Sequence, residues 1–139
     1  MSKKRLRSEI LRLEIAKRAK NCCEYCRVHE DDMFIGFEID HIIAHKHGGG
    51  NEIENLAYAC PHCNQHKGSD LVTFLDSYDD IVMLYNPRKH EWEEHFETNL
   101  GEIIAKTKIG KATIKLLKIN DIDLIILRNI LSEIGRYPM

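Results

Sequence analysis

The stretch that decides the fold runs from Glu38 to Gly68. It reads Glu38-Ile39-Asp40-His41-Ile42-Ile43, then Gly48-Gly49-Gly50-Asn51, then Asn55-Leu56, and finally Cys60-Pro61-His62-Cys63-Asn64-Gln65-His66-Lys67-Gly68. An acid directly precedes a histidine in an apolar run, a glycine-rich turn follows, and a cysteine pair leads into Asn-x-x-Lys. No single piece decides the interpretation, which rests on their order and spacing.

The cysteines of this stretch belong to a larger pattern. Four of the five cysteines form two Cys-x-x-Cys pairs, Cys23 with Cys26 and Cys60 with Cys63, with 33 residues between the pairs. Four thiolates in two such knuckles suit a tetrahedral, closed, structural Zn²⁺ site. The fifth, Cys22, is expected to be a small buried apolar side chain, although it could compete with Cys23 as a ligand. An odd cysteine count makes a disulfide framework unexpected.

Composition bounds the class of protein. The 139 residues are 43% hydrophobic and 30% charged, which predicts one globular domain over residues 1–139. No apolar run approaches the roughly 18 residues of a membrane helix, so no membrane partner is expected. The first residues, Met1-Ser2-Lys3-Lys4-Arg5, lack the apolar segment of a signal peptide, so the expected localisation is cytoplasmic.

Charge is unevenly distributed along the chain. Residues 1–20 carry eight basic and two acidic side chains, whereas residues 70–102 carry two basic and nine acidic ones. A basic end beside an acidic centre is compatible with nucleic-acid binding, and it is equally compatible with ordinary solvated faces.

The periodicity predicts an α+β chain. We expect a helix from Ser8 to about Lys20, an extended run over residues 34–44, and a helix that begins at Pro61, which together make two strands and a helix held by zinc. Beyond Gly68 we expect the helix to continue over residues 71–75, then a strand over 81–85 and a hairpin whose arms are residues 92–97 and 103–107. Two helices should follow, starting near Thr107 and Asp121.

The central residues suit phosphodiester hydrolysis. A neutral imidazole such as His41 can take a proton from water, and a hard divalent cation prefers oxygen ligands such as those of Asp40 and Asn64. On a strand, however, His41 points to the side opposite Asp40. The pair can divide the work only if the backbone bends there or the substrate lies across the strand end.

These motifs resemble the HNH endonuclease family in its zinc-bound, ββα-metal form. The resemblance covers about residues 20–70, the core, and it rests on Cys23-Glu24-Tyr25-Cys26, Ile39-Asp40-His41-Ile42-Ile43, Gly48-Gly49-Gly50-Asn51, Glu54-Asn55-Leu56 and the stretch from Cys60 to Lys67. The remainder, about residues 71–139, resembles C-terminal extensions of small bacterial members through Asn86-Pro87-Arg88, Trp92-x-x-His95-Phe96 and Gly110-Lys111-Ala112-Thr113. This second resemblance implies no catalytic role.

The resemblance implies roles for the matching residues. His41 would be the general base, and Asn55 would fix the loop and orient the histidine. Asp40 and Asn64 would hold one catalytic Mg²⁺ or Mn²⁺ ion, separate from the structural zinc.

Two further residues of the same helix take part in this interpretation. Lys67 would lie near a phosphate of the nucleic acid. His66 remains an alternative ligand for the catalytic ion, although positions 64 and 66 face differently on a helix and only one should reach the ion.

Three functions compete. The first is a metal-dependent DNA endonuclease, acting on double-stranded DNA without a small-molecule cofactor. The second is a non-catalytic zinc-finger module that binds nucleic acid or protein, which explains the cysteines and the basic ends but not the nuclease spacing of Asp40-His41, Asn55 and Asn64. The third, a redox protein that uses Cys-x-x-Cys, is incompatible with a tightly bound zinc. The sequence leaves the oligomeric state open.

Overall fold

Helix α1 (Lys3–Arg18) comes first in the computed structural model, which describes residues 2–138. Its N-cap is Ser2, whose hydroxyl oxygen accepts the backbone N–H of Arg5 at 3.1 Å. The sequence-based start at Ser8 is therefore wrong. Residues 3–7 are lysine, arginine and leucine, which favour helix, so the helix extends back to the earlier cap. Only the C-terminal half of α1 buries side chains, namely Ile15 and Ala16.

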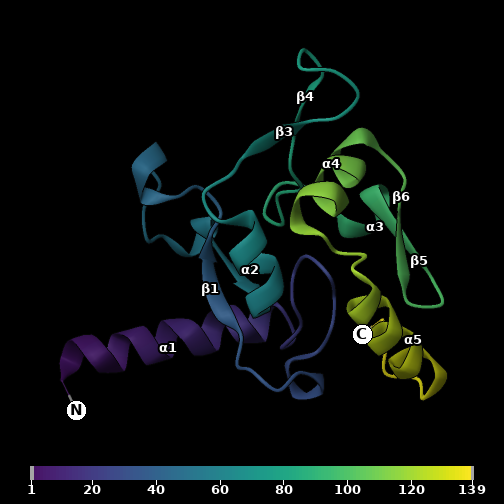
Figure 1. The fold of residues 1–139 in the computed structure, drawn as a ribbon. Coiled ribbons are helices and arrows are strands. Elements are labelled where there is room, and N and C mark those ends of the chain that lie inside the picture. The colour runs from purple at the N-terminus through teal and green to yellow at the C-terminus, as the bar shows by residue number, and fades with distance from the viewer. Residues whose placement is uncertain (1, 139) are drawn as a thin grey trace.

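The two Cys-x-x-Cys knuckles lie before and after a two-stranded sheet in the sequence, and the second knuckle begins a helix. Strand β1 (Glu38–His41) pairs antiparallel with β2 (Leu56–Ala59), and helix α2 (Pro61–Lys67) follows directly (Figure 1). Short 3₁₀ turns cover residues 30–32, 45–47 and 53–55. Pro61 lies in the first turn of α2, where its missing N–H has no intrahelical partner to lose. The predicted arrangement of two strands and a helix is confirmed.

The predicted extended run over residues 34–44 is too long, since only four residues pair. The partner β2 fits between the turn that ends at Asn55 and the knuckle that begins at Cys60, so the ladder has no room for more. Phe34 and Ile35 instead lie exposed in an irregular segment.

The C-terminal half adds two hairpins and three helices. Strand β3 (Val72–Phe74) pairs with β4 (Ile81–Met83), and β5 (Phe96–Asn99) pairs with β6 (Glu102–Ala105). Helix α3 (Trp92–His95) precedes β5, and helices α4 (Lys108–Leu117) and α5 (Ile122–Glu133) follow β6. In all, residues 2–138 form five α-helices and three two-stranded antiparallel sheets, a mixed α+β fold.

The predicted continuation of α2 over residues 71–75 is wrong. Gly68, at φ 52°, ends α2, and Val72 and Phe74 are in a strand whose alternation suits β structure. The predicted helix start at Thr107 is confirmed, because the Thr107 hydroxyl oxygen accepts the N–H of Gly110 at 3.1 Å.

The C-terminal half packs directly on the first knuckle. The indole N–H of Trp92 donates to the carbonyl of Tyr25 at 2.9 Å, and the Tyr137 hydroxyl donates to the carbonyl of Cys26 at 2.8 Å. One hydrophobic cluster contains residues of both halves, from Ile15 to Tyr137. Among residues 2–138, no helix combines the length and the apolar character that crossing a membrane requires.

Candidate functional site

The four paired cysteines converge on one buried point. The Sγ atoms of Cys23, Cys26, Cys60 and Cys63 all lie within 4.8 Å of one another, and the side chains of all four are buried. The Sγ atoms of Cys26 and Cys60 are 3.8 Å apart. A tetrahedral Zn²⁺ with Zn–S bonds of about 2.3 Å separates its sulfurs by roughly 3.8 Å, so this donor set fits the ion in geometry and in chemistry.

The local backbone prepares both knuckles. The N–H of Cys26 points to the Sγ of Cys23 at 3.4 Å, and the N–H of Cys63 points to the Sγ of Cys60 at the same distance. These N–H groups stabilise thiolate charge. Cys22 is buried but lies outside the four-cysteine group, and its thiol faces the carbonyl of Lys20 at 3.5 Å.

Asp40 lies in the interior on the side of β1 that faces α2. Its carboxylate accepts the hydroxyl of Tyr25 at 2.6 Å, and the ammonium of Lys67 lies 3.3 Å from each of its two oxygens. Only 3% of the Asp40 side chain is exposed. Burial raises the pKa of Asp40 above its ordinary value, and the adjacent Lys67 charge acts in the opposite direction.

Lys67 differs from the sequence-based expectation. Its side chain is only 2% exposed, and its ammonium also donates to the carbonyls of His41 and Ile42, at 3.3 and 3.1 Å. The enclosed ammonium neutralises the Asp40 carboxylate and binds the backbone carbonyls at the end of β1. It does not present its charge to a phosphate at the surface.

His41 lies on the opposite face of β1. Its Nε2 is 2.8 Å from the Oδ1 of Asn51, and its ring is 4.7 Å from the ring of His45. Together with Ser8 and Arg12 of α1, it lines a hollow of about 350 Å³. The alternation of the strand therefore separates the predicted base from the predicted acid ligand.

Asn55 braces the loop that follows His41. Its side-chain oxygen accepts the N–H of Ile43 at 2.9 Å, and its amide nitrogen donates to the carbonyls of Ile43 and Gly50, each at 2.9 Å. Residue 49 must be glycine for the same loop to close, because a Cβ there would stand 1.7 Å from the carbonyl oxygen of Ile43. The ring of His41 contacts Asn51 rather than Asn55.

The two candidate ligands on α2 point in different directions. The amide of Asn64 donates to the carboxylate of Glu38, two residues before Asp40 on the same strand face. His66 instead makes its contacts within α2: its Nδ1 is 2.7 Å from the carbonyl of His62, and its ring lies 4.1 Å from the His62 ring. The ring of His62 in turn reaches the carbonyl of Leu117 at the C-terminal end of α4. Asn64 is thus the one of the two that borders β1.

The predicted catalytic ion fits this arrangement only in part. Asn64 offers an amide oxygen near the surface, and hard divalent cations favour oxygen donors. The Asp40 carboxylate is already neutralised by Lys67 and is closed to solvent. As arranged, Asp40 is not a free ligand for an ion, because Lys67 and Tyr25 already occupy its carboxylate.

Three contacts of the site were not anticipated from the sequence: Tyr25 to Asp40, Glu38 to Asn64, and Asn51 to His41. Asn51 ends the glycine-rich motif that follows β1, and this motif is the sequence signal for its proximity to His41. The contact of Tyr25 depends on how the knuckle folds over β1, for which the sequence has no local signal.

The central segment of the chain matches a known protein family. Residues 23–70 match the family model of the HNH endonuclease. No curated protein and no solved structure matches the chain. The matched segment contains all four clustered cysteines, the β1–β2 hairpin and α2, and the candidate residues His41, Asn55 and Asn64 lie within it. Residues 23–70 are therefore similar to the HNH endonuclease domain, and they contain a four-cysteine site suited to zinc.

Proposed function

We propose that this protein is a metal-dependent endonuclease that hydrolyses phosphodiester bonds of DNA. The observation that carries the proposal is the placement of His41. Within a segment of the HNH family, its imidazole is held by Asn51 and lines a hollow, beside a loop braced by Asn55. A general base has to be positioned and reachable in this way.

The hydrogen bond to Asn51 prepares the His41 ring for proton transfer. With the Asn51 amide oxygen as acceptor, Nε2 carries the ring proton and Nδ1 has a free lone pair. That nitrogen can take a proton from a water molecule as the water attacks a phosphorus atom. The hydrogen bonds that the Asn55 side-chain amide donates to the carbonyls of Ile43 and Gly50 hold the loop after His41 in place beside the hollow.

Mg²⁺ or Mn²⁺ is the cofactor that we propose for this reaction, in addition to structural zinc. A bound divalent ion supplies charge neutralisation for the phosphate and for the leaving oxygen. Asn64 is the ligand that the geometry favours over His66, since it borders β1. Asp40 qualifies as a second ligand only after Lys67 moves off its carboxylate.

The substrate that we propose is DNA, entering beside α1. The hollow in front of His41 has Ser8 and Arg12 of α1 in its wall, and the N-terminal half of α1 carries further exposed basic residues. Figure 1 shows α1 passing under β1 and projecting beyond it. Positive charge beside the base would hold a phosphate backbone over the imidazole.

The proposal is tested by nicking of supercoiled plasmid in the presence and absence of Mg²⁺ or Mn²⁺. We expect cleavage only with the ion, and we expect His41→Ala to slow it by about 10²–10⁴-fold, the range for loss of a general base. His47→Ala is the matched control, because His47 is an exposed histidine in the loop that follows β1. Equal cleavage by His41→Ala and the parent would refute the assignment.

The second candidate function is a zinc-finger module that binds nucleic acid without cutting it. The buried, Lys67-neutralised state of Asp40 is the observation in its favour, because it leaves the predicted ion site incomplete. DNA binding without any divalent-dependent cleavage would select this alternative.

A further inference from the structure

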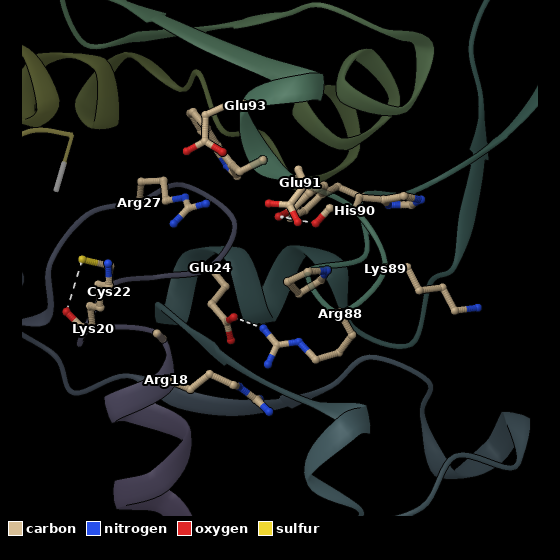
Figure 2. Close-up of a pocket in the computed structure, with 14 residues that line it drawn as sticks. Arg18, Lys20, Cys22, Glu24, Arg27, Arg88, Lys89, His90, Glu91 and Glu93 are labelled. Atoms are coloured by element: carbon tan, nitrogen blue, oxygen red, sulfur yellow. Dashed lines mark hydrogen bonds and ion pairs between the residues drawn. The ribbon is translucent and has the colours of Figure 1, made fainter.

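A second polar cavity lies away from His41, where the matched segment meets the C-terminal half. It has a volume of about 350 Å³ and lies between the C-terminal end of α1, the first knuckle and residues 85–93 (Figure 2). Five cationic and three acidic side chains line it; the cationic ones are Arg18, Lys20, Arg27, Arg88 and Lys89. The lining is therefore net positive in a protein whose overall charge is −2.

The acid nearest the centre of this cavity is already engaged. Glu24 accepts the N–H of Tyr58 at 2.8 Å with one oxygen, and its other oxygen pairs with Arg88 (Figure 2). The three carboxylates of the lining cannot neutralise all five of its cations. Glu91 and Glu93, which also line the cavity, are exposed side chains.

The guanidinium groups here have donors without acceptors. Among the described residues, the Nε of Arg27 and the Nε and Nη1 of Arg88 have no hydrogen-bond partner. An unsatisfied buried donor costs about 1–3 kcal/mol, and such groups are rare in native proteins without a reason. Binding an acceptor-rich anion, with a small rotation of either side chain, would satisfy them.

Both arginines are held in place around the cavity. The guanidinium of Arg27 lies over the ring of Trp92, 5.2 Å from its centroid. Arg88 sits in the Asn86-Pro87-Arg88 turn, where the Asn86 side-chain oxygen accepts the Arg88 N–H at 2.9 Å. Pre-positioned forks of this kind bind phosphate oxygens with little loss of side-chain entropy.

Arg18 adds positive charge to the lining of the cavity. It donates to the carbonyls of Ile53 at 2.9 Å and of Leu56, so its guanidinium is fixed without a carboxylate. Burial lowers the pKa of Arg18, and repulsion from the charge of Arg88 acts in the same direction, while Glu24 and Glu54 oppose it. An anion would relieve that repulsion.

We propose that this cavity is a phosphate-binding site, formed by Arg27 and Arg88 with Arg18 and Lys89 nearby. The phosphate could belong to a nucleic-acid backbone or be free, as inorganic phosphate or a mononucleotide. The site gives a role to Asn86-Pro87-Arg88, which lies beyond the matched segment. It needs no participation of His41, which is not among the residues that line this cavity.

The test measures binding separately from cleavage. All variants are made in the full-length, zinc-loaded His41→Ala protein without added divalent ions, so the failure of the endonuclease proposal would not affect the result. Titration calorimetry follows inorganic phosphate and a 5′-mononucleotide, and fluorescence anisotropy follows a labelled DNA duplex. The variants are Arg27→Gln, Arg27→Lys and Lys89→Gln, the last because Lys89 is exposed and its loss should not disturb folding.

Lys111→Gln is the control, because it removes one charge from α4, outside the cavity lining, where Lys111 pairs with Asp76 at 3.9 Å. We expect Arg27→Gln to raise the dissociation constant at least about tenfold, the size of one charge-assisted hydrogen bond. We expect Arg27→Lys to bind more weakly than the parent and Lys111→Gln to bind as the parent does. Circular dichroism and zinc content verify that each variant is folded.

The three ligands distinguish the sources of the phosphate. If Arg27→Gln and Lys89→Gln weaken binding of phosphate or mononucleotide, the site takes a free phosphate group. If they weaken only duplex binding, it takes a backbone phosphate. If neither variant differs from Lys111→Gln for any of the three ligands, the proposal is overturned.

Discussion

Replacing Lys67 by methionine tests the most unexpected contact of the central segment. Methionine keeps most of the side-chain volume but removes the ammonium that lies 3.3 Å from both Asp40 oxygens. The two side chains are 2% and 3% exposed, so water cannot take over from the lost cation. Breaking a buried ion pair by removing one partner costs about 3–5 kcal/mol. The carbonyls of His41 and Ile42 also lose a donor.

That loss is large beside a total stability of about 5–15 kcal/mol for a typical domain. At roughly 2–4 °C per kcal/mol for a chain of this size, Tm should fall by about 6–20 °C. Urea unfolding followed by circular dichroism, at a fixed zinc concentration, measures the free energy directly. Asp40→Asn/Lys67→Met is the matched control. With both charges gone and an acceptor left for Tyr25, it should lose less than the sum of the two single variants.

Two results would contradict the buried pair. One is a Lys67→Met protein within about 0.5 kcal/mol of the parent, the usual range for surface substitutions. The other is strict additivity in the double variant. A stable Lys67→Met protein that binds DNA more weakly would restore the sequence-based role of Lys67 at a phosphate.

Three other perturbations have definite outcomes. Cys60→Ser should abolish stoichiometric zinc in metal analysis and leave residues 23–70 unfolded by hydrogen exchange, since structural zinc contributes directly to folding. Asn55→Ala should destabilise by about 1–3 kcal/mol in urea, because the N–H of Ile43 loses its acceptor, and it should slow plasmid nicking as the loop loosens. Burial acts to raise the pKa of Glu30, yet the hydrogen bonds that its carboxylate accepts from the Phe37 N–H and the Tyr58 hydroxyl hold that pKa below its ordinary value. The ionised Glu30 carboxylate stabilises the folded protein fully at pH values above its pKa in the unfolded chain. This stabilisation is lost as the pH falls through the lower pKa of the folded protein. The difference in unfolding free energy between the parent and Glu30→Gln should therefore shrink below about pH 4.5.

The sequence predicted those features whose physics is local. Cysteine spacing alone predicts the four-sulfur group, because two-residue knuckles constrain where the thiols can lie. Pro61 and Thr107 mark helix starts because a proline ring or a hydroxyl acts within one turn. The same reasoning predicted that Asn64 and His66 face differently on α2; Asn64 contacts Glu38 of β1, whereas His66 contacts His62 of its own helix.

Long-range packing accounts for the rest. Nothing near Lys67 in the sequence indicates that its ammonium is enclosed, since the enclosing groups come from β1. The length of β1 depends on how many residues β2 can offer as partners. The cavity lined by Arg27 and Arg88 lies between α1, the first knuckle and the segment around Arg88. These segments are distant in the sequence, so their side chains come together only in the folded chain.

The hydrogen bonds from Trp92 and Tyr137 to the first knuckle have a consequence for transferring the central segment to another protein. Residues 23–70 excised alone would leave the carbonyls of Tyr25 and Cys26 without their donors and would expose the apolar underside that the C-terminal half covers. A graft into another scaffold would have to bring the tryptophan and tyrosine along or build substitutes for both. The family match ends at residue 70, but the part of the chain needed to cover the first knuckle extends to Tyr137.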